Sequence, residues 1–265
     1  MVSFKAAAAL MAFATFSNAL PVTEPELVER QTYSSPPLLN QAAQAKGKLW
    51  FGSEIDTTSA EINDEKYMTI FNVSQVWGQT TPGNTMKWDY TEYEQGSFTL
   101  APGQQTIDLA KATGKKVRCH NLVWYQEIPP YITNPTTPWT NATLLAAMEE
   151  HINGVVKGYG ANCYSWDVVN EALNDDGTWR NNTFYEYIGP AYVPLAFRYA
   201  SAAVKSFGGN VKLFYNDYNI EFPGAKTTAA VELVQSIKAY GAEIDGVGFE
   251  SHFIVGETVS QSSYF

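Results

Sequence analysis

Residues 164–171 read Tyr-Ser-Trp-Asp-Val-Val-Asn-Glu, a short and largely apolar run that ends in two polar residues. Its length and its aromatic and β-branched side chains predict a β-strand at 164–170. A helical pattern precedes it at 144–159 and stops at Gly160, and another follows at 193–207 and stops at Gly208. A strand between two helices is the repeating unit of a parallel sheet.

The same alternation runs through most of the chain. Further strands are expected at 49–52, 75–79, 116–120, 211–216 and 244–250. Further helices are expected at 60–71, 105–113 and 226–240. Six consecutive units favour an α/β fold of the (β/α)8 TIM barrel type, with about six of the eight units present, over a doubly wound sheet. Residues 38–265 also fall short of the roughly 250 residues that a typical barrel needs.

Polar and aromatic residues gather where the expected strands end. In a barrel, the C-terminal ends of the strands carry the active site. The residues at these ends are Asn84, Lys87, His120, Trp124, Asn170, Glu171, Asn216, Asp217, Glu250 and His252. One polar residue at a strand end is ordinary, but such residues at five consecutive strand ends predict a functional site.

Within the strand at 164–170, alternation places Glu171 on the same face as Asp167 and Val169. A carboxylic acid that is partly desolvated at a barrel mouth has a raised pKa and can protonate a leaving oxygen. Asn170 belongs to the other face, and it reaches the same site only if the strand twists or bulges. The alternative is that the Asn-Glu pair is only a polar entry into a loop.

Charge and composition narrow the classes of ligand. The formal net charge is −10, which argues against nucleic acid and against an anionic membrane surface, because both are bound through Lys and Arg. A neutral ligand fits better. The chain has 7 Trp and 16 Tyr, which a well-packed core explains and which stacking on sugar faces would also explain. No G-x-G-x-x-G sequence follows the first strand, so no dinucleotide cofactor is expected.

The N-terminal segment has the pattern of a secreted protein. Lys5 precedes an apolar run at 6–16, and small residues follow that run, which predicts a signal peptide at 1–19. Residues 20–37 are rich in Pro, Glu and Ser and are expected to be a propeptide or a disordered leader. Residues 38–265 are then the folded domain, and no later segment is long and apolar enough to span a membrane.

In a secreted protein, the three N-x-S/T sequons at Asn72, Asn141 and Asn181 are candidate glycosylation sites. Such sequons also arise by chance. Cys119 and Cys163 are the two cysteines. They fall on expected strands at opposite ends, so neither a mutual disulfide nor a metal site is expected.

Five segments resemble, in order, the motifs of glycoside hydrolase family 10, whose members are mainly retaining endo-xylanases on (β/α)8 barrels. The segment WDVVNEAL at 166–173 resembles the acid/base signature of the family. The other four are TPGNTMKW at 81–88, VRCHNLVW at 117–124, LFYNDYN at 213–219 and DGVGFESH at 245–252. They resemble the family's T-P-E-N-x-M-K-W, V-R-G-H-T-L-V-W, Y-N-D-Y-N and D-G-I-G-x-Q-S-H, and five ordered motifs are highly specific.

This resemblance implies hydrolysis of internal β-1,4-xylosidic bonds of xylan with retention, by a monomer without metal or cofactor. Glu171 would be the general acid/base, and Asn170 would bind the 2-hydroxyl of the sugar at the cleavage point. Trp124 would form an apolar wall beneath a sugar ring, and His252 would orient the nucleophile. The implied substrate-binding residues are Asn84, Lys87, His120, Trp124, Asn170, Glu250 and His252.

Several positions depart from the family pattern. Gly83 replaces a Glu, which implies that one sugar contact is lost or moved. Cys119 replaces a Gly and is expected to be a small buried thiol. Tyr125 stands where a His is common, and Glu127 and Glu250 stand where Gln is usual.

The family nucleophile is a Glu in a T-E-L-D-like motif on strand seven, and this sequence contains no such motif. Retaining chemistry needs two carboxyl groups about 5–5.5 Å apart. Glu250 is the one substitute to consider, but its family counterpart binds the nucleophile and does not replace it. The alternative to a xylanase is therefore an inactive truncated form or pseudoenzyme that at most binds xylan weakly.

Overall fold

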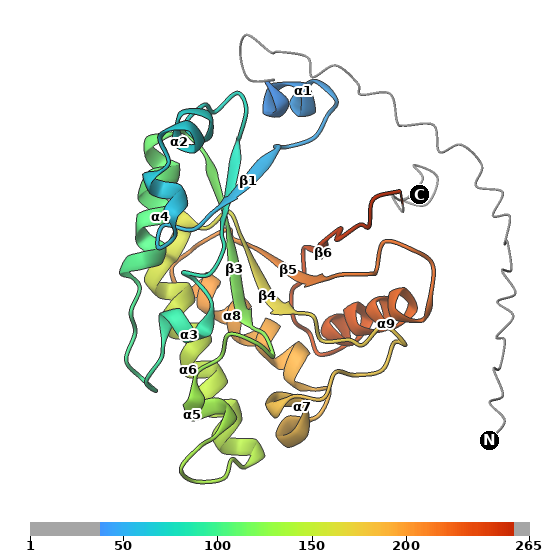
Figure 1. The fold of residues 1–265 in the computed structure, drawn as a ribbon. Helices are drawn as coiled ribbons and strands as arrows, with labels where there is room; N and C mark the ends of the chain where they lie inside the picture. Colours follow the sequence, from blue (N-terminus) through green and yellow to red (C-terminus); the bar gives the residue numbers. More distant parts are fainter. Residues whose placement is uncertain (1–37, 257–265) are drawn as a thin grey trace, which may run out of the picture. The chain divides into compact units, whose positions relative to one another are not determined.

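A computed structural model describes residues 38–256 of the chain. The expected signal peptide at 1–19 and the leader at 20–37 lie outside the described residues, so both remain predictions. The described residues build six parallel strands that pair in chain order (Figure 1). The strands are β1 (Gly52–Ile55), β2 (Gln79–Pro82), β3 (Lys116–Val123), β4 (Ser165–Asn170), β5 (Lys212–Asp217) and β6 (Gly246–Phe249). This curled sheet confirms the expected fold class, a (β/α)8 barrel of which six units are present.

The first two strands begin three to four residues later in the chain than the sequence suggests. Residues 49–52 and 75–79 were expected to pair, but the paired residues are Gly52–Ile55 and Gln79–Pro82. The reason is that the aromatic residues before each strand pack with one another and not within the ladder. Phe51 stacks on Trp77 with ring centroids 5.5 Å apart, at the N-terminal end of both strands.

Helices connect the strands. They are α1 (Leu39–Ala45), α2 (Glu65–Phe71), α3 (Trp88–Thr91), α4 (Ala101–Ala112), α5 (Pro130–Thr133), α6 (Asn141–Tyr159), α7 (Thr183–Ile188), α8 (Tyr192–Ser206) and α9 (Ala225–Ala239), with short 3-10 turns η1 (Ala60–Asn63) and η2 (Gly160–Asn162). The helix expected at 60–71 is therefore two pieces. Asp64 has an extended backbone that ends the first piece, and its carboxylate caps α2 by accepting the N–H groups of Lys66 and Tyr67. Within residues 38–256, every helix is too short or too polar to cross a bilayer.

Helix α6 shows why the long helices form and where they end. Thr140 and Thr143 exchange hydrogen bonds in a capping box that starts the helix. Its buried residues recur every three or four positions, which creates one apolar face. Gly160 ends it with a φ of 56°, a conformation that glycine adopts without strain.

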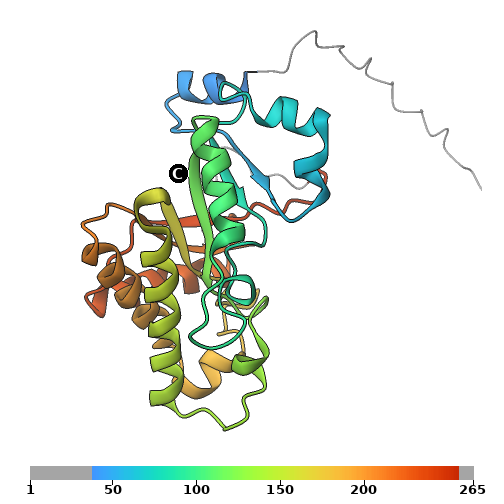
Figure 2. The same ribbon diagram turned by 90° about the vertical axis from the view of Figure 1, so that its left-hand side faces the viewer.

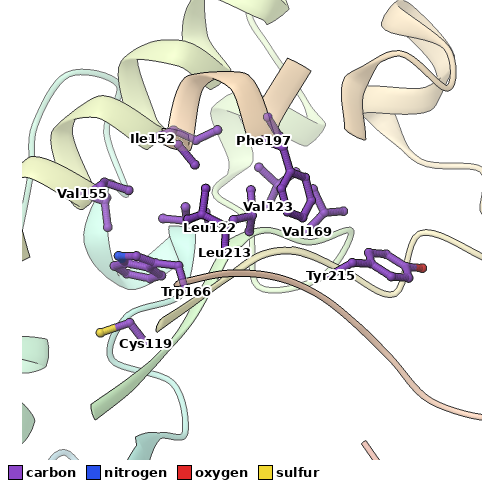
Figure 3. Close-up of a cluster of buried hydrophobic side chains, with 14 of the residues drawn as sticks. Cys119, Leu122, Val123, Ile152, Val155, Trp166, Val169, Phe197, Leu213 and Tyr215 are labelled. Atoms are coloured by element: carbon purple, nitrogen blue, oxygen red, sulfur yellow. The ribbon is translucent and has the colours of Figure 1, made fainter. Parts of the chain in front are cut away.

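Helices α4, α6 and α8 pack against the sheet, and Figures 1 and 2 show them running along its outer side. In the close-up of Figure 3, side chains from three strands meet side chains from two helices. They are Leu122, Val123, Val169 and Leu213 from the sheet, with Ile152 and Val155 from α6 and Phe197 from α8, and none exposes more than 2% of its surface. Burying each such side chain stabilises the fold by about 1.5–3 kcal/mol. The middle of the sheet is therefore a rigid support for groups at the strand ends.

The two cysteines form a disulfide, so the expectation of a free, buried thiol at Cys119 was wrong. Their α carbons are 5.7 Å apart. Cys163 directly follows η2 and lies two residues before β4, which pairs with the strand that carries Cys119. Neighbouring strands lie only about 4.8 Å apart, and the η2 turn that leads into β4 brings the second cysteine within reach. Placing both residues at opposite strand ends overlooked that turn.

Candidate active site

A cleft of about 430 Å³ opens at the C-terminal ends of the strands. It is lined by Glu54, Thr81, Pro82, Gly83, Arg118, His120, Trp124, Asn170, Glu171, Asn216, Phe249, Glu250 and His252. Residues from all six strands or the loops that follow them contribute. The strand-end residues singled out from the sequence that line the cleft together are His120, Trp124, Asn170, Glu171, Asn216, Glu250 and His252.

Glu171 lies directly after β4 and is 9% exposed. Its φ of 53° is unusual for a residue with a side chain, and such strained positions concentrate at functional sites. The backbone is held there because the Glu171 N–H donates to the carbonyl oxygen of Asn216 on β5, at 2.8 Å. The local chain thus presents the carboxyl group to the cleft and not to the helices outside the sheet.

Irregular pairing of β4 explains why two consecutive residues share the cleft. The register between β4 and β5 shifts between Asp167 and Val169, and a similar shift occurs between β3 and β4. A shift of this kind turns a side chain that alternation assigns to the opposite face. The Asn170 amide reaches Oε1 of Glu171 at 3.2 Å. The twist or bulge that the sequence reading required is therefore present.

A buried ion network supports the floor of the cleft. Asp167, whose side chain is fully buried, contacts Arg118 Nε at 3.0 Å and His120 Nδ1 at 2.9 Å. Burial alone would raise the pKa of Asp167, but the charge of Arg118 and the hydrogen bonds from His120 and Arg118 lower it below its ordinary value. Arg118 was not singled out from the sequence, although a charged residue inside an apolar strand pattern was a usable signal.

Asn216 links the strand that carries Asn170 to the segment that carries Glu250. Its Nδ2 donates to Oδ1 of Asn170 at 2.7 Å and to Oε1 of Glu250 at 2.8 Å. Oε2 of Glu250 lies 3.1 Å from Nε2 of His252, whose side chain is 74% exposed. The strand-end residues of β4, β5 and β6 are thus joined by hydrogen bonds into one polar surface.

Glu250 has the strongest pKa shift among the carboxyl groups of the cleft. Its burial, the neighbouring charges of Glu171 and Asp217, and a hydrogen bond with Glu171 raise the pKa of Glu250 to about 8. The raised pKa favours the protonated form of the Glu250 carboxyl group in the folded protein. Glu127, the other departure towards a carboxylate, does not line the cleft.

Asn84 and Lys87 do not line the cleft. Lys87 Nζ donates to Oδ1 of Asn84 at 2.7 Å, and Asn84 Nδ2 donates to Oδ2 of Asp56 at 2.7 Å. Lys87 Nζ also lies 5.0 Å from the ring centroid of Trp124, which does line the cleft. Glu171 and His120 therefore line the cleft themselves, whereas Lys87 reaches it only through its contact with Trp124.

Arg180 is a residue of the site that sequence reasoning missed. It lies in the loop after β4, and its Nε donates to the carbonyl oxygen of Glu171 at 3.0 Å. Its guanidinium lies over the ring of Tyr125, 4.4 Å from the centroid, and donates to the Tyr218 hydroxyl at 2.8 Å. The neighbouring Glu171 carboxyl group, together with burial, raises the pKa of the Tyr125 hydroxyl, which places the two groups close together. Arg180 thus holds the backbone of Glu171, and Tyr125 lies beside its side chain.

The remaining sequence-based sites lie apart from the cleft. Asn72, Asn141 and Asn181 are all exposed, as glycosylation would require. Residues 38–256 contain no cluster of three or more His, Cys, Asp or Glu side chains that could hold a metal ion.

A parallel barrel-type sheet with hydrogen-bonded carboxyl groups in a cleft at its strand ends defines a protein of the (β/α)8 glycosidase class. The chain belongs to glycosyl hydrolase family 10, whose family model matches residues 38–264. This match confirms the resemblance that the five sequence motifs indicated.

Individual relatives agree with this assignment. Endo-1,4-beta-xylanase D of Talaromyces funiculosus is 54% identical over 222 residues, which are 84% of this chain and 52% of that protein. Endo-1,4-beta-xylanase A of Phanerodontia chrysosporium is 44% identical over 83% of this chain and 52% of its own length. The crystal structure of the GH10 xylanase from Bispora sp. MEY-1 with xylobiose superposes with a TM-score of 0.83 at 52% identity, over 85% of this chain and 68% of that one. The chain spans about half the length of the curated relatives it matches.

Proposed function

We propose that this chain carries the acid/base part of an endo-1,4-β-xylanase that cleaves internal bonds of xylan with retention. The observation that supports this most is Glu171: a nearly buried carboxyl group at the end of β4, facing the cleft beside Asn170 and Glu250. A carboxylic acid at this place can protonate the leaving oxygen of a glycosidic bond and later deprotonate the attacking water.

The other groups have roles that follow from their placement. Asn170 is held by Asn216 with its own amide towards Glu171, where it can bind the 2-hydroxyl of the sugar at the cleavage point. Glu250, held by Asn216 and close to His252, forms the wall of the cleft from β6. His120 is oriented by Asp167, and Trp124 offers a ring face against which a sugar can pack. Asn84 and Lys87 do not line the cleft, and we propose that they position the Trp124 ring, because Lys87 contacts that ring and donates to Asn84.

Retaining hydrolysis also needs a second carboxyl group that acts as the nucleophile. The 265 residues contain no T-E-L-D-like motif, and the carboxyl groups that line the cleft are those of Glu54, Glu171 and Glu250. Glu250 is poorly suited as a nucleophile, since Asn216 donates to one of its oxygens and His252 lies 3.1 Å from the other. The second candidate function is therefore an inactive form that binds xylan weakly.

Expression in two forms separates these candidates. One form is the 265-residue chain, and the other, called here the extended form, is the same chain joined to the part of the Talaromyces funiculosus relative that follows the matched region. We expect release of reducing sugar from xylan by the extended form and none by the 265-residue chain. Activity of the shorter form that is lost in Glu171→Ala would show that Glu250 or another carboxylate replaces the nucleophile. Inactivity of a folded extended form would overturn the xylanase proposal.

We further propose that the protein is a secreted, glycosylated monomer. The disulfide between Cys119 and Cys163 supports secretion, because such bonds persist mainly in oxidising compartments. The exposed sequons support glycosylation. Mass spectrometry of the protein secreted by a fungal host tests cleavage of residues 1–37 and occupancy of each sequon. An uncleaved N-terminus in the secreted protein would contradict the proposed leader.

A further inference from the structure

Glu54 on β1 occupies the space that a side chain at position 83 would fill. Gly83 follows the neighbouring strand β2, and both residues line the cleft. An added Cβ on Gly83 would lie only 2.2 Å from Oε1 of Glu54. The Glu54 carboxylate is therefore laid directly over the bare backbone of Gly83, and any larger residue there would displace it.

The Glu54 carboxylate is available for a ligand. It is exposed, and no hydrogen-bond donor among the described residues 38–256 is recorded for it. Partial desolvation and the nearby Glu61 and Asp56 carboxylates raise its pKa, and the Lys87 charge opposes them. A carboxylate that lines the cleft and has no partner in the described part of the chain is free to accept hydrogen bonds from a ligand.

The sequence gives an independent reason. Gly83 stands where the family motif has a Glu, and that departure implies a sugar contact that is lost or moved. The structure places a carboxylate from the adjacent strand in the vacated volume. The carboxylate that the family motif carries after β2 is thus absent here, and a carboxylate from β1 occupies its space.

We propose that Glu54 is a substrate-binding residue that accepts hydrogen bonds from two adjacent hydroxyl groups of a xylose ring in the cleft. The proposal rests on the proposed function, because it assumes that the cleft holds a xylan chain. A carboxylate has two acceptor oxygens, which suit a pair of neighbouring hydroxyls, and bonds to a charged acceptor are stronger than neutral ones.

Binding of xylotriose to the 265-residue chain at pH 7.5, measured by titration calorimetry, tests this inference. We expect Glu54→Gln to weaken binding about tenfold, because a charge-assisted acceptor is lost. Glu232→Gln, which removes an exposed carboxylate from α9, should leave binding unchanged. The double variant Glu54→Ala/Gly83→Glu, which returns the carboxylate to β2, should bind within about threefold of the unchanged chain. Circular dichroism confirms that each variant is folded.

Two outcomes overturn the inference, and they are distinguishable. If the unchanged chain binds xylotriose and folded Glu54→Gln binds it equally well, Glu54 is not a binding residue, although the proposed function stands. If the folded, unchanged chain does not bind xylotriose at all, the proposed function fails and the inference fails with it. Gly83→Ala is a second probe: displacing the carboxylate while keeping Glu54 should also weaken binding.

Discussion

The carboxyl groups of Glu171 and Glu250 share a hydrogen bond in the cleft. Two carboxylates cannot both carry a charge at such a separation without a large cost, so the pair keeps a proton near neutral pH. Burial and the neighbouring charges raise the pKa of Glu250 to about 8. The family pattern usually has Gln at this position, and a protonated carboxyl group is the nearest chemical equivalent of an amide that donates one hydrogen bond and accepts another.

Replacing Glu250 with Gln should stabilise the protein at alkaline pH. The folded-state pKa of about 8 lies above the ordinary value of 4.5, so the folded state binds the proton more tightly than the unfolded state does. Glu250 therefore makes the free energy of unfolding fall as pH rises from about 4.5 to 8, after which its effect is constant. Since the group is partly screened by solvent, we expect a gain of about 1 kcal/mol, or about 2–4 °C in Tm, at pH 8.5 and almost none at pH 4.5. Thermal unfolding at both pH values measures this, and an equal gain at both would contradict it.

Replacing Asp167 with Asn should be strongly destabilising. It removes the buried carboxylate that Arg118 contacts at 3.0 Å, and because the Arg118 side chain is 32% exposed we expect a loss of about 2 kcal/mol, less than for a fully buried pair. Because the pKa of Asp167 lies below its ordinary 3.8, the difference between variant and unchanged chain should be complete above about pH 5 and shrink as the pH falls below 4. Urea unfolding across this range provides the measurement.

The matched control for this variant is Glu243→Gln, which breaks the pair with Lys205 on the surface. Both partners of that pair are more than half exposed, at 64% and 59%. An exposed pair contributes about 0–1 kcal/mol, so this variant should be nearly neutral. Equal effects of the two variants would mean that the Asp167 network does not support the cleft.

The disulfide should contribute much of the stability of the domain. Cys119 and Cys163 are 44 residues apart, and closing a loop of that size in the unfolded chain is worth about 4 kcal/mol in the chain-entropy model. We expect the variant Cys119→Ala/Cys163→Ala to lose roughly that amount in urea unfolding. Thiol titration of the denatured, unreduced protein should find no free thiol, and two free thiols would show that the bond does not form.

Parts of this site could be predicted because they depend on local pattern. Strand four and its two polar end residues are visible in a run of eight amino acids, and parallel strands in a barrel bring their ends together whatever the loops do. Glu171, Asn170 and His120 were found in this way. Each needs only the position of its own strand.

Other parts depend on how strands are offset from one another, which no short segment encodes. The disulfide follows from the turn before β4, and Arg180 reaches Glu171 only because its loop folds back over Tyr125. Glu54 was missed because β1 begins at Gly52, later than its apolar run suggests. In all three cases the decisive information is a register or a loop path, and a side-chain pattern cannot supply it.

The most direct test of the central claim, that Glu171 is the general acid/base, compares two substrates in the extended form. With Glu171→Ala, xylan hydrolysis should fall by about 10²- to 10⁴-fold, because the leaving sugar needs a proton. A dinitrophenyl xylobioside, whose leaving group needs no proton, should still react in its first step, and added azide should accelerate turnover by replacing the water that Glu171 activates. An equal loss on both substrates, with no effect of azide, would contradict the account.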